Sequence, residues 1–260
     1  GASFTATSPK RPYIASELQG LSMHRIGIIG DLHAEHERLE LTLEYLDGVG
    51  VDAIICTGDI PAGRGDLDRC CELLRQAHVL SVAGNHDRWF LQDKVRHVDN
   101  AHLRHEARAE TVAYIEQLPK TRMLCTSAGS LILCHGMLDD DLAKIWPGSE
   151  NASSRCSAAL DELLAEPDPP RFIVNGHMHF RTVIDFPNTQ VINAGTLKGQ
   201  FAGFSVLDVQ QCQIESLNFS SANDLSLSCR MTLGASRGRR VWQSTEEFDG
   251  QWQPVVVHRA

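Results

Sequence analysis

Five short motifs in this 260-residue chain contain His, Asp or Asn, and each directly follows an apolar run with the composition of a β-strand. Imidazole and carboxylate groups are common ligands of divalent transition metals. In an open α/β sheet, residues at the carboxyl ends of the strands gather along one rim, so the five motifs are expected to converge. The motifs are DLH at 31–33, GD at 58–59, GNHD at 84–87, HG at 135–136 and GHMH at 176–179.

The number of these motifs indicates one metal site rather than five unrelated features. A single buried His is usually a hydrogen-bonded core residue, and a lone GNHD stretch fits a simple turn, because Gly and Asn suit turns. Polar side chains at five strand ends, by contrast, break the local rules of folding and therefore suggest a function. A site for two metals also needs a bridging group, which a carboxylate can supply. Two metals about 3.5–4 Å apart can clamp a phosphoryl group and activate water.

The elements that carry the first three motifs alternate between strands and helices. Short apolar runs predict strands, and Leu and Cys residues at helical spacing predict helices between them. This β-α-β-α-β alternation predicts a largely parallel sheet with helices packed on it. The expected strands cover 25–30, 52–56 and 79–82, and the expected helices cover 36–46, 67–77 and 106–118.

The second half of the chain is richer in strands. Short apolar runs joined by turns predict a mixed or antiparallel sheet, with one helix at 157–165 before a Pro-rich break. We therefore expect an α/β fold, a four-layer α-β-β-α sandwich in which two facing mixed β-sheets are flanked by helices. The expected strands cover 122–125, 130–134, 172–175, 182–186, 190–193 and 202–209.

Composition narrows the possible partners. The formal net charge of -9 argues against nonspecific binding to nucleic acid or to an anionic membrane surface. It does not exclude a phosphate ester, because bound metal ions reverse the local charge. No apolar run approaches the roughly 20 residues of a membrane span. The eight cysteines include no CxxC pair, which favours free thiols in a reducing cytosol and thus a cytoplasmic location.

The order of the five motifs resembles the calcineurin-like metallophosphoesterase superfamily. The resemblance covers about residues 24–209. The stretch VINAGTL at 191–197 is similar to the INPGS stretch of small bacterial and archaeal YfcE-like members, with Ala194 in place of Pro and Thr196 in place of Ser. The resemblance implies a metallophosphoesterase domain at 23–218, preceded by an N-terminal extension at 1–22. Residues 219–260 would then be a C-terminal appendage, either extra strands or a partly ordered tail.

The resemblance also implies a role for each motif residue. Two divalent ions, drawn from Mn, Fe, Ni or Zn, would share a hydroxide that attacks phosphorus. His86 would act as the general acid that protonates the leaving oxygen, and Asp87 would either orient His86 or shape the turn. One metal would bind Asp31, His33 and His179, the other Asn85, His135 and His177, and Asp59 would bridge both.

Three functions remain open at this point. A phosphodiesterase is slightly favoured, because this activity is common among the YfcE-like members. A phosphomonoesterase is the alternative, although the GDxxDRG loop of protein phosphatases is imperfect here, since Arg64 stands five residues after Asp59. A non-catalytic scaffold, like a retromer subunit of this fold, would have an eroded metal site, whereas all seven ligand positions are competent here. The expected partner is a small phosphate ester or a nucleotide, with Arg64 and Arg88 as candidate contacts. Trp146 is either a core residue, which is favoured, or a stacking partner for a nucleobase.

Overall fold

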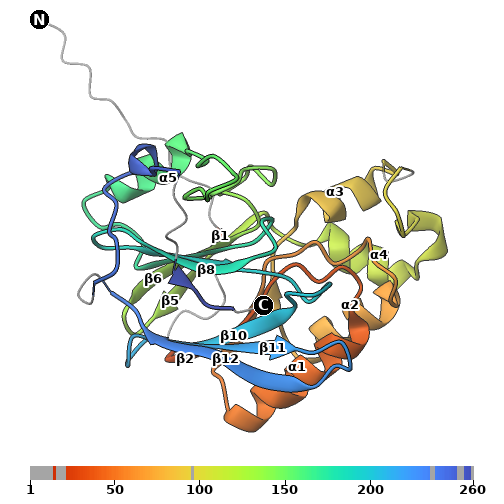
Figure 1. The fold of residues 1–260 in the computed structure, drawn as a ribbon. Coiled ribbons are helices and arrows are strands. Elements are labelled where there is room, and N and C mark those ends of the chain that lie inside the picture. Colours follow the sequence, from red (N-terminus) through yellow and green to blue (C-terminus); the bar gives the residue numbers. More distant parts are fainter. Residues whose placement is uncertain (1–13, 16–21, 95–96, 235–237, 251–254, 259–260) are drawn as a thin grey trace, which may run out of the picture.

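The computed structural model describes residues 14–15, 22–94, 97–234, 238–250 and 255–258, which form two facing β-sheets with helices outside them (Figure 1). The first sheet has six strands in the order β12-β11-β10-β2-β3-β4. Strands β2, β3 and β4 are parallel, and β10, β11 and β12 continue the sheet with antiparallel pairing. The strands are β2 (Arg25–Ile29), β3 (Ala53–Cys56), β4 (Leu80–Ser81), β10 (Gly203–Asp208), β11 (Gln213–Phe219) and β12 (Leu225–Thr232).

The second sheet has seven strands in the order β1-β5-β6-β7-β9-β8-β13. Its central strands β6, β7 and β9 are parallel to one another, and antiparallel pairs lie on both sides of them. Both sheets are therefore mixed. The strands are β1 (Ile14–Ala15), β5 (Thr121–Thr126), β6 (Gly129–Cys134), β7 (Phe172–Asn175), β8 (Arg181–Asp185), β9 (Gln190–Ala194) and β13 (Val255–Val256).

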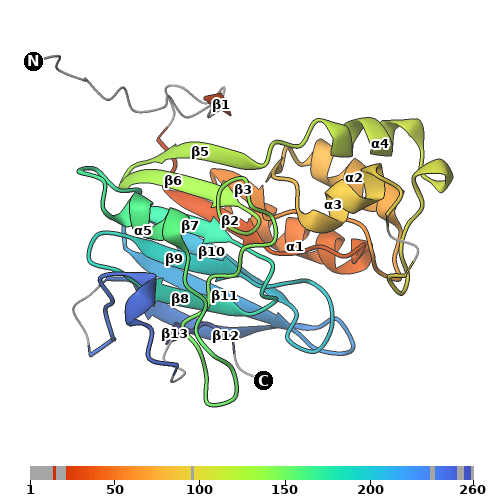
Figure 2. The same ribbon diagram turned by 90° about the horizontal axis from the view of Figure 1, so that it is seen from above.

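Helices complete the outer layers of the sandwich. Figure 2 shows α1 to α4 gathered beside the strands, whereas α5 lies over the seven-stranded sheet. This arrangement confirms the expected four-layer α/β sandwich. The α-helices are α1 (His36–Val49), α2 (Leu67–Gln76), α3 (Asn85–Leu91), α4 (Ala109–Glu116) and α5 (Ala158–Leu164), and two short 3₁₀ turns are η1 (Arg104–Glu106) and η2 (Thr245–Glu247).

Three buried apolar clusters lie between the four layers. Successive side chains of a strand point to opposite faces of the sheet, so one strand contributes residues to two of these clusters. In β2, Ile26 and Ile28 face the second sheet, whereas Ile29 packs with the helices α1 and α2. In β6, Leu133 faces the first sheet, whereas Ile132 packs with α5. Both sheets are thus covered on each face, and this rigid frame fixes the ends of their strands.

The structure differs from the sequence-based expectation in one helix, and it contains elements that were not expected. The expected helix at 106–118 divides into the 3₁₀ turn η1 and the helix α4, because Ala107 and Arg108 adopt extended backbone angles. The GNHD motif opens a helix that was not expected: α3 begins at Asn85, and the Asp87 carboxylate accepts a hydrogen bond from the backbone N–H of Gly84. Strand β11 was not expected, although its residues 213–218 pair with β10.

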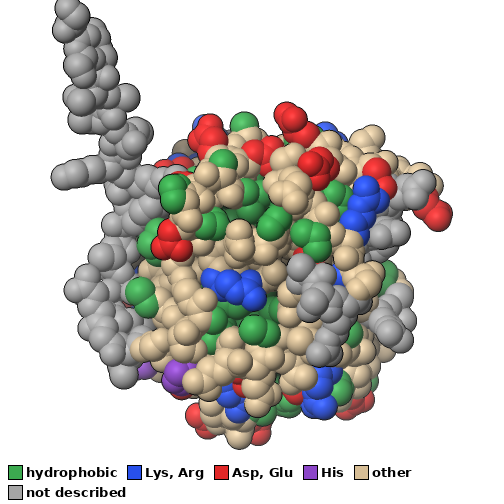
Figure 3. Space-filling model, turned by 90° about the vertical axis from the view of Figure 1, so that its left-hand side faces the viewer, with side chains coloured by type: hydrophobic (Ala, Val, Ile, Leu, Met, Phe, Trp, Pro, Cys, Tyr) green, Lys and Arg blue, Asp and Glu red, His purple; other side chains and the backbone are tan. Residues whose placement is uncertain are grey.

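The terminal segments contribute to both sheets where they are described. In residues 219–260, β12 extends the six-stranded sheet and β13 pairs with β8, while Trp242 is buried under the second sheet. Most of the expected N-terminal extension at 1–22 lies outside the described residues, but β1 pairs with β5. Figure 3 shows the face opposite α3 and α4, where the described Lys and Arg side chains are scattered rather than joined in a stripe.

No helix in the described part of the chain combines the length and apolar character that a membrane span requires.

Candidate metal centre

The structure brings all seven candidate ligands to one rim of the two sheets, beside the start of α3. Asp31 and His33 follow β2, Asp59 follows β3, and Asn85 is the first residue of α3. From the other sheet, His135 follows β6, and His177 and His179 lie between β7 and β8. Five of the seven are at most 3% exposed, whereas His177 and His179 are half-buried.

The first group of donor atoms comes from Asp31, His33, Asp59 and His179, and one donor atom of each lies within 4.8 Å of the others. The Nε2 atom of His179 is 3.1 Å from Oδ2 of Asp31 and 3.1 Å from Nε2 of His33. The Nε2 atom of His33 is in turn 3.9 Å from Oδ2 of Asp59. Two imidazoles and two carboxylates thus face a common point, which suits a divalent transition metal.

The second group contains Asp59, His135 and His177, again within 4.8 Å of one another. The Nε2 atom of His135 lies 3.3 Å from Oδ2 of Asp59 and 3.0 Å from Oδ1 of Asn85. Asp59 therefore belongs to both groups. A carboxylate shared by two donor groups is the arrangement that a bridged two-metal site requires.

Backbone carbonyls fix which nitrogen of two imidazoles faces the site. The Nδ1 atom of His33 lies 3.0 Å from the carbonyl of Ala62, and that of His135 lies 2.7 Å from the carbonyl of Thr57. Each Nδ1 must carry a proton to donate to its carbonyl, so each Nε2 is left to bind a cation. Such hydrogen bonds orient metal-binding histidines and raise their basicity. The donor set therefore fits a divalent metal.

Four of the seven candidate ligands have left-handed backbone conformations. The φ angles are 45° at His33, 48° at Asp59, 68° at His177 and 61° at His179. Residues other than Gly adopt such angles rarely, and the strain persists only where the surroundings enforce it. Clustering of this strain at one rim marks the rim as a functional site.

The Asp87 carboxylate holds the strained turn at Asp59. It accepts hydrogen bonds from the backbone N–H groups of Asp59 (2.7 Å), Gly84 (2.7 Å) and Ile60 (3.1 Å), and it is fully buried. Burial and the nearby charge of Asp59 raise the pKa of Asp87 to about 7. Asp87 thus positions the backbone around a candidate ligand, and no hydrogen bond joins its carboxylate to the ring of His86.

Two glycines leave the space that two of the carboxylate ligands occupy. A Cβ atom on Gly84 would lie 2.2 Å from Oδ1 of Asp59, and one on Gly176 would lie 2.3 Å from Oδ1 of Asp31. Both distances are impossible for real atoms, so any larger residue would displace a carboxylate. These glycines in the GNHD and GHMH motifs are therefore required by the close approach of backbone to the site.

Opposite charges shift the protonation of the donors in the metal-free protein. Burial opposes the charged form of His135, but the carboxylates of Asp31 and Asp59 outweigh it and raise the pKa of His135 to about 10. Burial likewise opposes the charge on Asp59, but His135 lowers the pKa of Asp59 below its usual range. Burial lowers the pKa of His33 and of His177. In the metal-free protein, the proton on Nε2 of His135, which faces the Asp59 carboxylate, therefore takes the place of a bound cation.

His86 lies at the edge of the donor groups. Its ring is 5.1 Å from that of His33 and 4.9 Å from that of Trp89, and its backbone N–H donates to Oδ1 of Asp59 at 2.8 Å. Burial lowers the pKa of His86. Among the described residues, none forms a hydrogen bond with the buried Nδ1 atom of His86. The ring is thus fixed beside the site without being one of the clustered donors.

The two candidate substrate arginines lie outside the donor cluster. Arg88 on α3 forms two hydrogen bonds with the Asp141 carboxylate, at 2.7 and 2.8 Å, and so ties α3 to the loop after β6. Arg64 is exposed in the loop after Asp59. A contact of either residue with substrate stays a prediction.

Sequence analysis missed Thr57 as part of the site. Its hydroxyl donates to Oδ1 of Asp31 at 2.9 Å, and its carbonyl faces Nδ1 of His135. Thr57 is fully buried and touches a donor from each sheet. Its position immediately before the Gly58-Asp59 motif was the one available signal.

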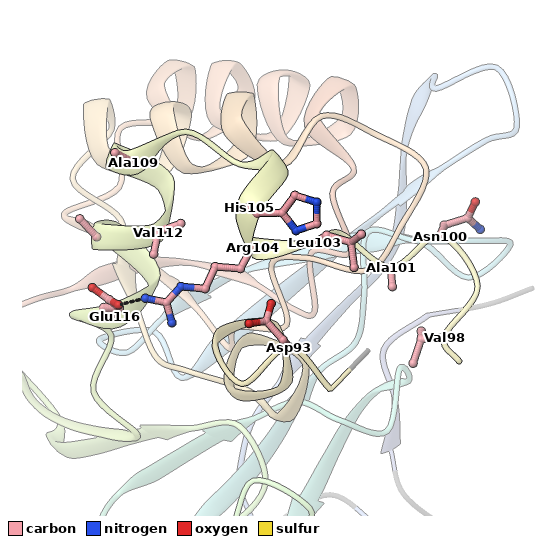
Figure 4. A pocket seen from close by; sticks show the side chains of 11 residues that line it. Asp93, Val98, Asn100, Ala101, Leu103, Arg104, His105, Ala109, Val112 and Glu116 are labelled. Carbon is pink, nitrogen blue, oxygen red and sulfur yellow. Dashed lines mark hydrogen bonds and ion pairs between the residues drawn. The ribbon is translucent and has the colours of Figure 1, made fainter. Parts of the chain in front are cut away.

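A pocket of about 1110 Å³ lies apart from the donor cluster (Figure 4). It opens between the loop after α3 and the elements η1 and α4, and the ion pair of Arg104 with Glu116 (2.7 Å) lies along it. None of the seven candidate ligands lines this pocket. The metal centre is thus a compact cluster at a rim and not the floor of this hollow.

Comparison with known proteins agrees with this arrangement. A crystal structure of a metallophosphoesterase from Sphaerobacter thermophilus is 22% identical, with a TM-score of 0.53, covering 73% of this chain and 85% of that one. The hypothetical protein PH1004 from Pyrococcus horikoshii OT3 is 10% identical with a TM-score of 0.61, and the match covers 75% of this chain and 87% of that one. YfcE, a phosphoesterase from E. coli, is 17% identical with a TM-score of 0.50, and the match covers 80% of this chain and 98% of that one. These likenesses establish the fold.

Sequence comparison assigns the family. The uncharacterized protein MJ0912 of Methanocaldococcus jannaschii is 39% identical over 62 residues, which are 24% of this chain. The match spans about a quarter, 26%, of that relative's length. The profile of the calcineurin-like phosphoesterase superfamily domain matches residues 24–211, a range that includes every candidate ligand. The chain therefore belongs to the calcineurin-like phosphoesterase superfamily.

Proposed function

We propose that this protein is a dinuclear metal-dependent hydrolase of phosphate esters, with a preference for phosphodiesters. The observation that carries the proposal is the pair of donor groups that share Asp59 and contain four strained ligand positions. Two bound divalent ions would supply Lewis acidity and activated water to the phosphoryl group. The first ion would bind Asp31, His33 and His179, the second Asn85, His135 and His177, with Asp59 between them.

The protein's own residues would position these groups and move one proton. Asp87 holds the backbone at Asp59, and the carbonyls of Ala62 and Thr57 orient two imidazoles so that their Nε2 atoms face the other candidate ligands. His86 would donate a proton to the departing oxygen. Burial lowers the pKa of His86 in the metal-free protein, and the negative charge of a bound phosphate ester would oppose that shift.

The pairing of Arg88 supports the preference for diesters. A phosphomonoester carries two negative charges at neutral pH, and proteins often hold such a group with a bidentate guanidinium. The Nε and Nη2 groups of Arg88, which form one bidentate edge of the guanidinium, already donate to Asp141. A diester carries one charge and needs no such clamp. The complete donor set gives no support to a non-catalytic scaffold.

We further propose a cytoplasmic enzyme that acts on a small phosphate ester or a nucleotide. All eight cysteines are free in the structure, which supports a reducing compartment. The net charge of -9 supports a small-molecule substrate over nucleic acid.

The test is reconstitution of metal-free protein with Mn, Ni, Fe, Zn or Mg, assayed on bis-p-nitrophenyl phosphate and p-nitrophenyl phosphate. We expect activity only after reloading, with two metals bound per chain and a higher kcat/KM for the diester. Absence of turnover with every metal, at full metal occupancy, would contradict the proposed activity.

A second test addresses the proton donor. The His86→Ala variant should retain both metals and lose about 10²–10⁴-fold in turnover on alkyl or nucleoside esters. Its loss on p-nitrophenyl esters should be clearly smaller, because that leaving group needs little protonation. An equal loss on both classes would exclude the general-acid role, and loss of metal would make His86 a ligand.

A further inference from the structure

Phe180 occupies an unusual position for a large apolar side chain. It directly follows His179 in the loop between β7 and β8, and its ring is half-buried. The side chain of His179 is itself 43% exposed, so this loop borders solvent on the donor side. An aromatic ring held next to a candidate metal ligand can contact whatever the site binds.

Three rings from distant parts of the chain surround Phe180. Its ring centroid is 5.7 Å from Trp146 in the loop after β6 and 5.8 Å from Phe201 in the loop after β9. His258, beyond β13, stacks on Phe180 at 5.6 Å with 29° between the ring planes. His258 also lies 5.6 Å from Phe201. Two of the three neighbours thus come from loops that leave strand ends on the candidate-site rim.

The inner side of this aromatic group is closed and rigid. Trp146 is 7% exposed and His258 is 6% exposed. His258 Nδ1 faces the carbonyl of Arg181 at 3.0 Å, and the guanidinium of Arg181 donates to the carbonyl of Phe201 at 3.3 Å. Phe180 and Phe201, by contrast, remain half-buried. Phe180 and Phe201 are therefore the more exposed members of the group, and Trp146 and His258 are its buried members.

The same rim carries a positive charge. Lys144 is exposed two residues before Trp146. It lies in the loop after β6, which also contains His135 and Trp146. Lys144 and the phenyl rings therefore lie on the side of the candidate site formed by the loops of the seven-stranded sheet. A cation beside aromatic rings suits a ligand that combines a phosphate with a planar ring.

We propose that Phe180 and Phe201 form a stacking subsite for a planar aromatic group of the substrate, such as the base of a nucleotide. This inference rests on the proposed phosphoesterase function and specifies its substrate class. Rings stack on any planar partner, so the subsite favours nucleosides and aromatic esters over alkyl esters without selecting one base. Because the rings are already held in place, little conformational entropy is lost on binding.

The test compares two diesters with the same leaving group: the p-nitrophenyl ester of thymidine 5′-monophosphate and methyl p-nitrophenyl phosphate. For the wild-type, metal-loaded protein we expect a higher kcat/KM on the thymidine ester. Phe180→Leu should lower kcat/KM for that ester by about tenfold, mainly through KM, because stacking contributes at this scale. The methyl ester should change less than twofold. Phe180→Tyr should keep the selectivity, and Phe201→Leu should lose part of it.

The matched control is Leu142→Ala, which removes an apolar side chain that is 49% exposed in the same loop as Trp146. It should leave both esters unchanged. An equal loss on both esters in Phe180→Leu would show that Phe180 only supports His179 and would overturn the subsite. Equal kcat/KM for the two esters in the wild type would also overturn it.

A binding measurement separates this inference from the proposed activity. Titration calorimetry with thymidine 5′-monophosphate and with methyl phosphate needs no turnover. About tenfold tighter binding of the nucleotide, lost in Phe180→Leu, would support the subsite even if neither ester were hydrolysed. Equal affinity of the two ligands would overturn the subsite even if both esters were hydrolysed.

Discussion

Replacing Thr57 with valine would remove one hydrogen bond from the candidate metal centre while keeping the shape of the side chain. The hydroxyl donates to Oδ1 of Asp31 at 2.9 Å, and both residues are fully buried. The Asp31 carboxylate would keep the backbone N–H of His177, which lies 3.1 Å from Oδ2. Valine also leaves the Thr57 carbonyl free to accept from His135.

The expected magnitude follows from this single lost contact. A buried hydrogen bond to a charged acceptor contributes about 1.5–3 kcal/mol. The methyl group that replaces the hydroxyl recovers up to about 0.8 kcal/mol through apolar burial. The free energy of unfolding of the metal-free protein should therefore fall by about 1–2 kcal/mol. Metal affinity should fall by about tenfold, because groups that orient a metal ligand contribute at this scale.

The assay combines urea unfolding of the metal-free protein with calorimetric titration of Mn. The control is Thr42→Val, because Thr42 is also fully buried and donates to the carbonyl of Arg38 within α1, far from the donors. We expect it to leave metal affinity unchanged. Loss of stability in Thr57→Val with unchanged metal affinity would refute the idea that Thr57 positions Asp31 for a metal.

Three further predictions follow from the same geometry. The folded-state pKa of His135, about 10, lies above its unfolded value of 6.5. Its stabilisation is therefore complete below pH 6.5 and is lost as the pH rises toward 10. Metal binding requires the neutral ring of His135, so binding of a metal at pH 7.5 should release a proton. Calorimetry in two buffers of different ionisation enthalpy measures this release, and a result of no released proton would contradict the prediction. Asp87→Asn should lower metal affinity by about 10–100-fold, because the amide cannot accept from all three N–H groups; an affinity equal to wild type in titration would show that Asp87 serves α3 alone. Brief alkylation at pH 8, read by mass spectrometry, should label the exposed Cys125 and Cys156 but spare Cys56 and Cys134, whose thiol pKa burial raises to about 12; labelling of the buried pair would indicate local opening.

Much of the fold could be predicted because the sequence expresses it locally. Apolar runs of four to six residues, each ending at a Gly or a polar ligand type, marked β2, β3, β6 and β7 within a residue or two. The errors arose where local pattern and tertiary context differ. The helix α3 starts inside the GNHD motif because Asp87 accepts from Gly84, a backbone bond that the spacing of apolar residues does not reveal. Likewise, β11 alternates too weakly to stand out before it pairs with β10.

The sequence by itself determined which residues could bind metal and that strand ends would carry them, because side-chain chemistry and strand periodicity are local properties. The resemblance implied that Asp59 bridges two metals, but only the tertiary structure places its carboxylate in both donor groups, since this depends on the distance between the two sheets. It also decided the left-handed backbone at His33 and Asp59, because contacts from Asp87 and from the neighbouring strand ends impose it. The aromatic group around Phe180 is assembled from three loops and the C-terminal segment, and no linear pattern connects residues that meet only after folding.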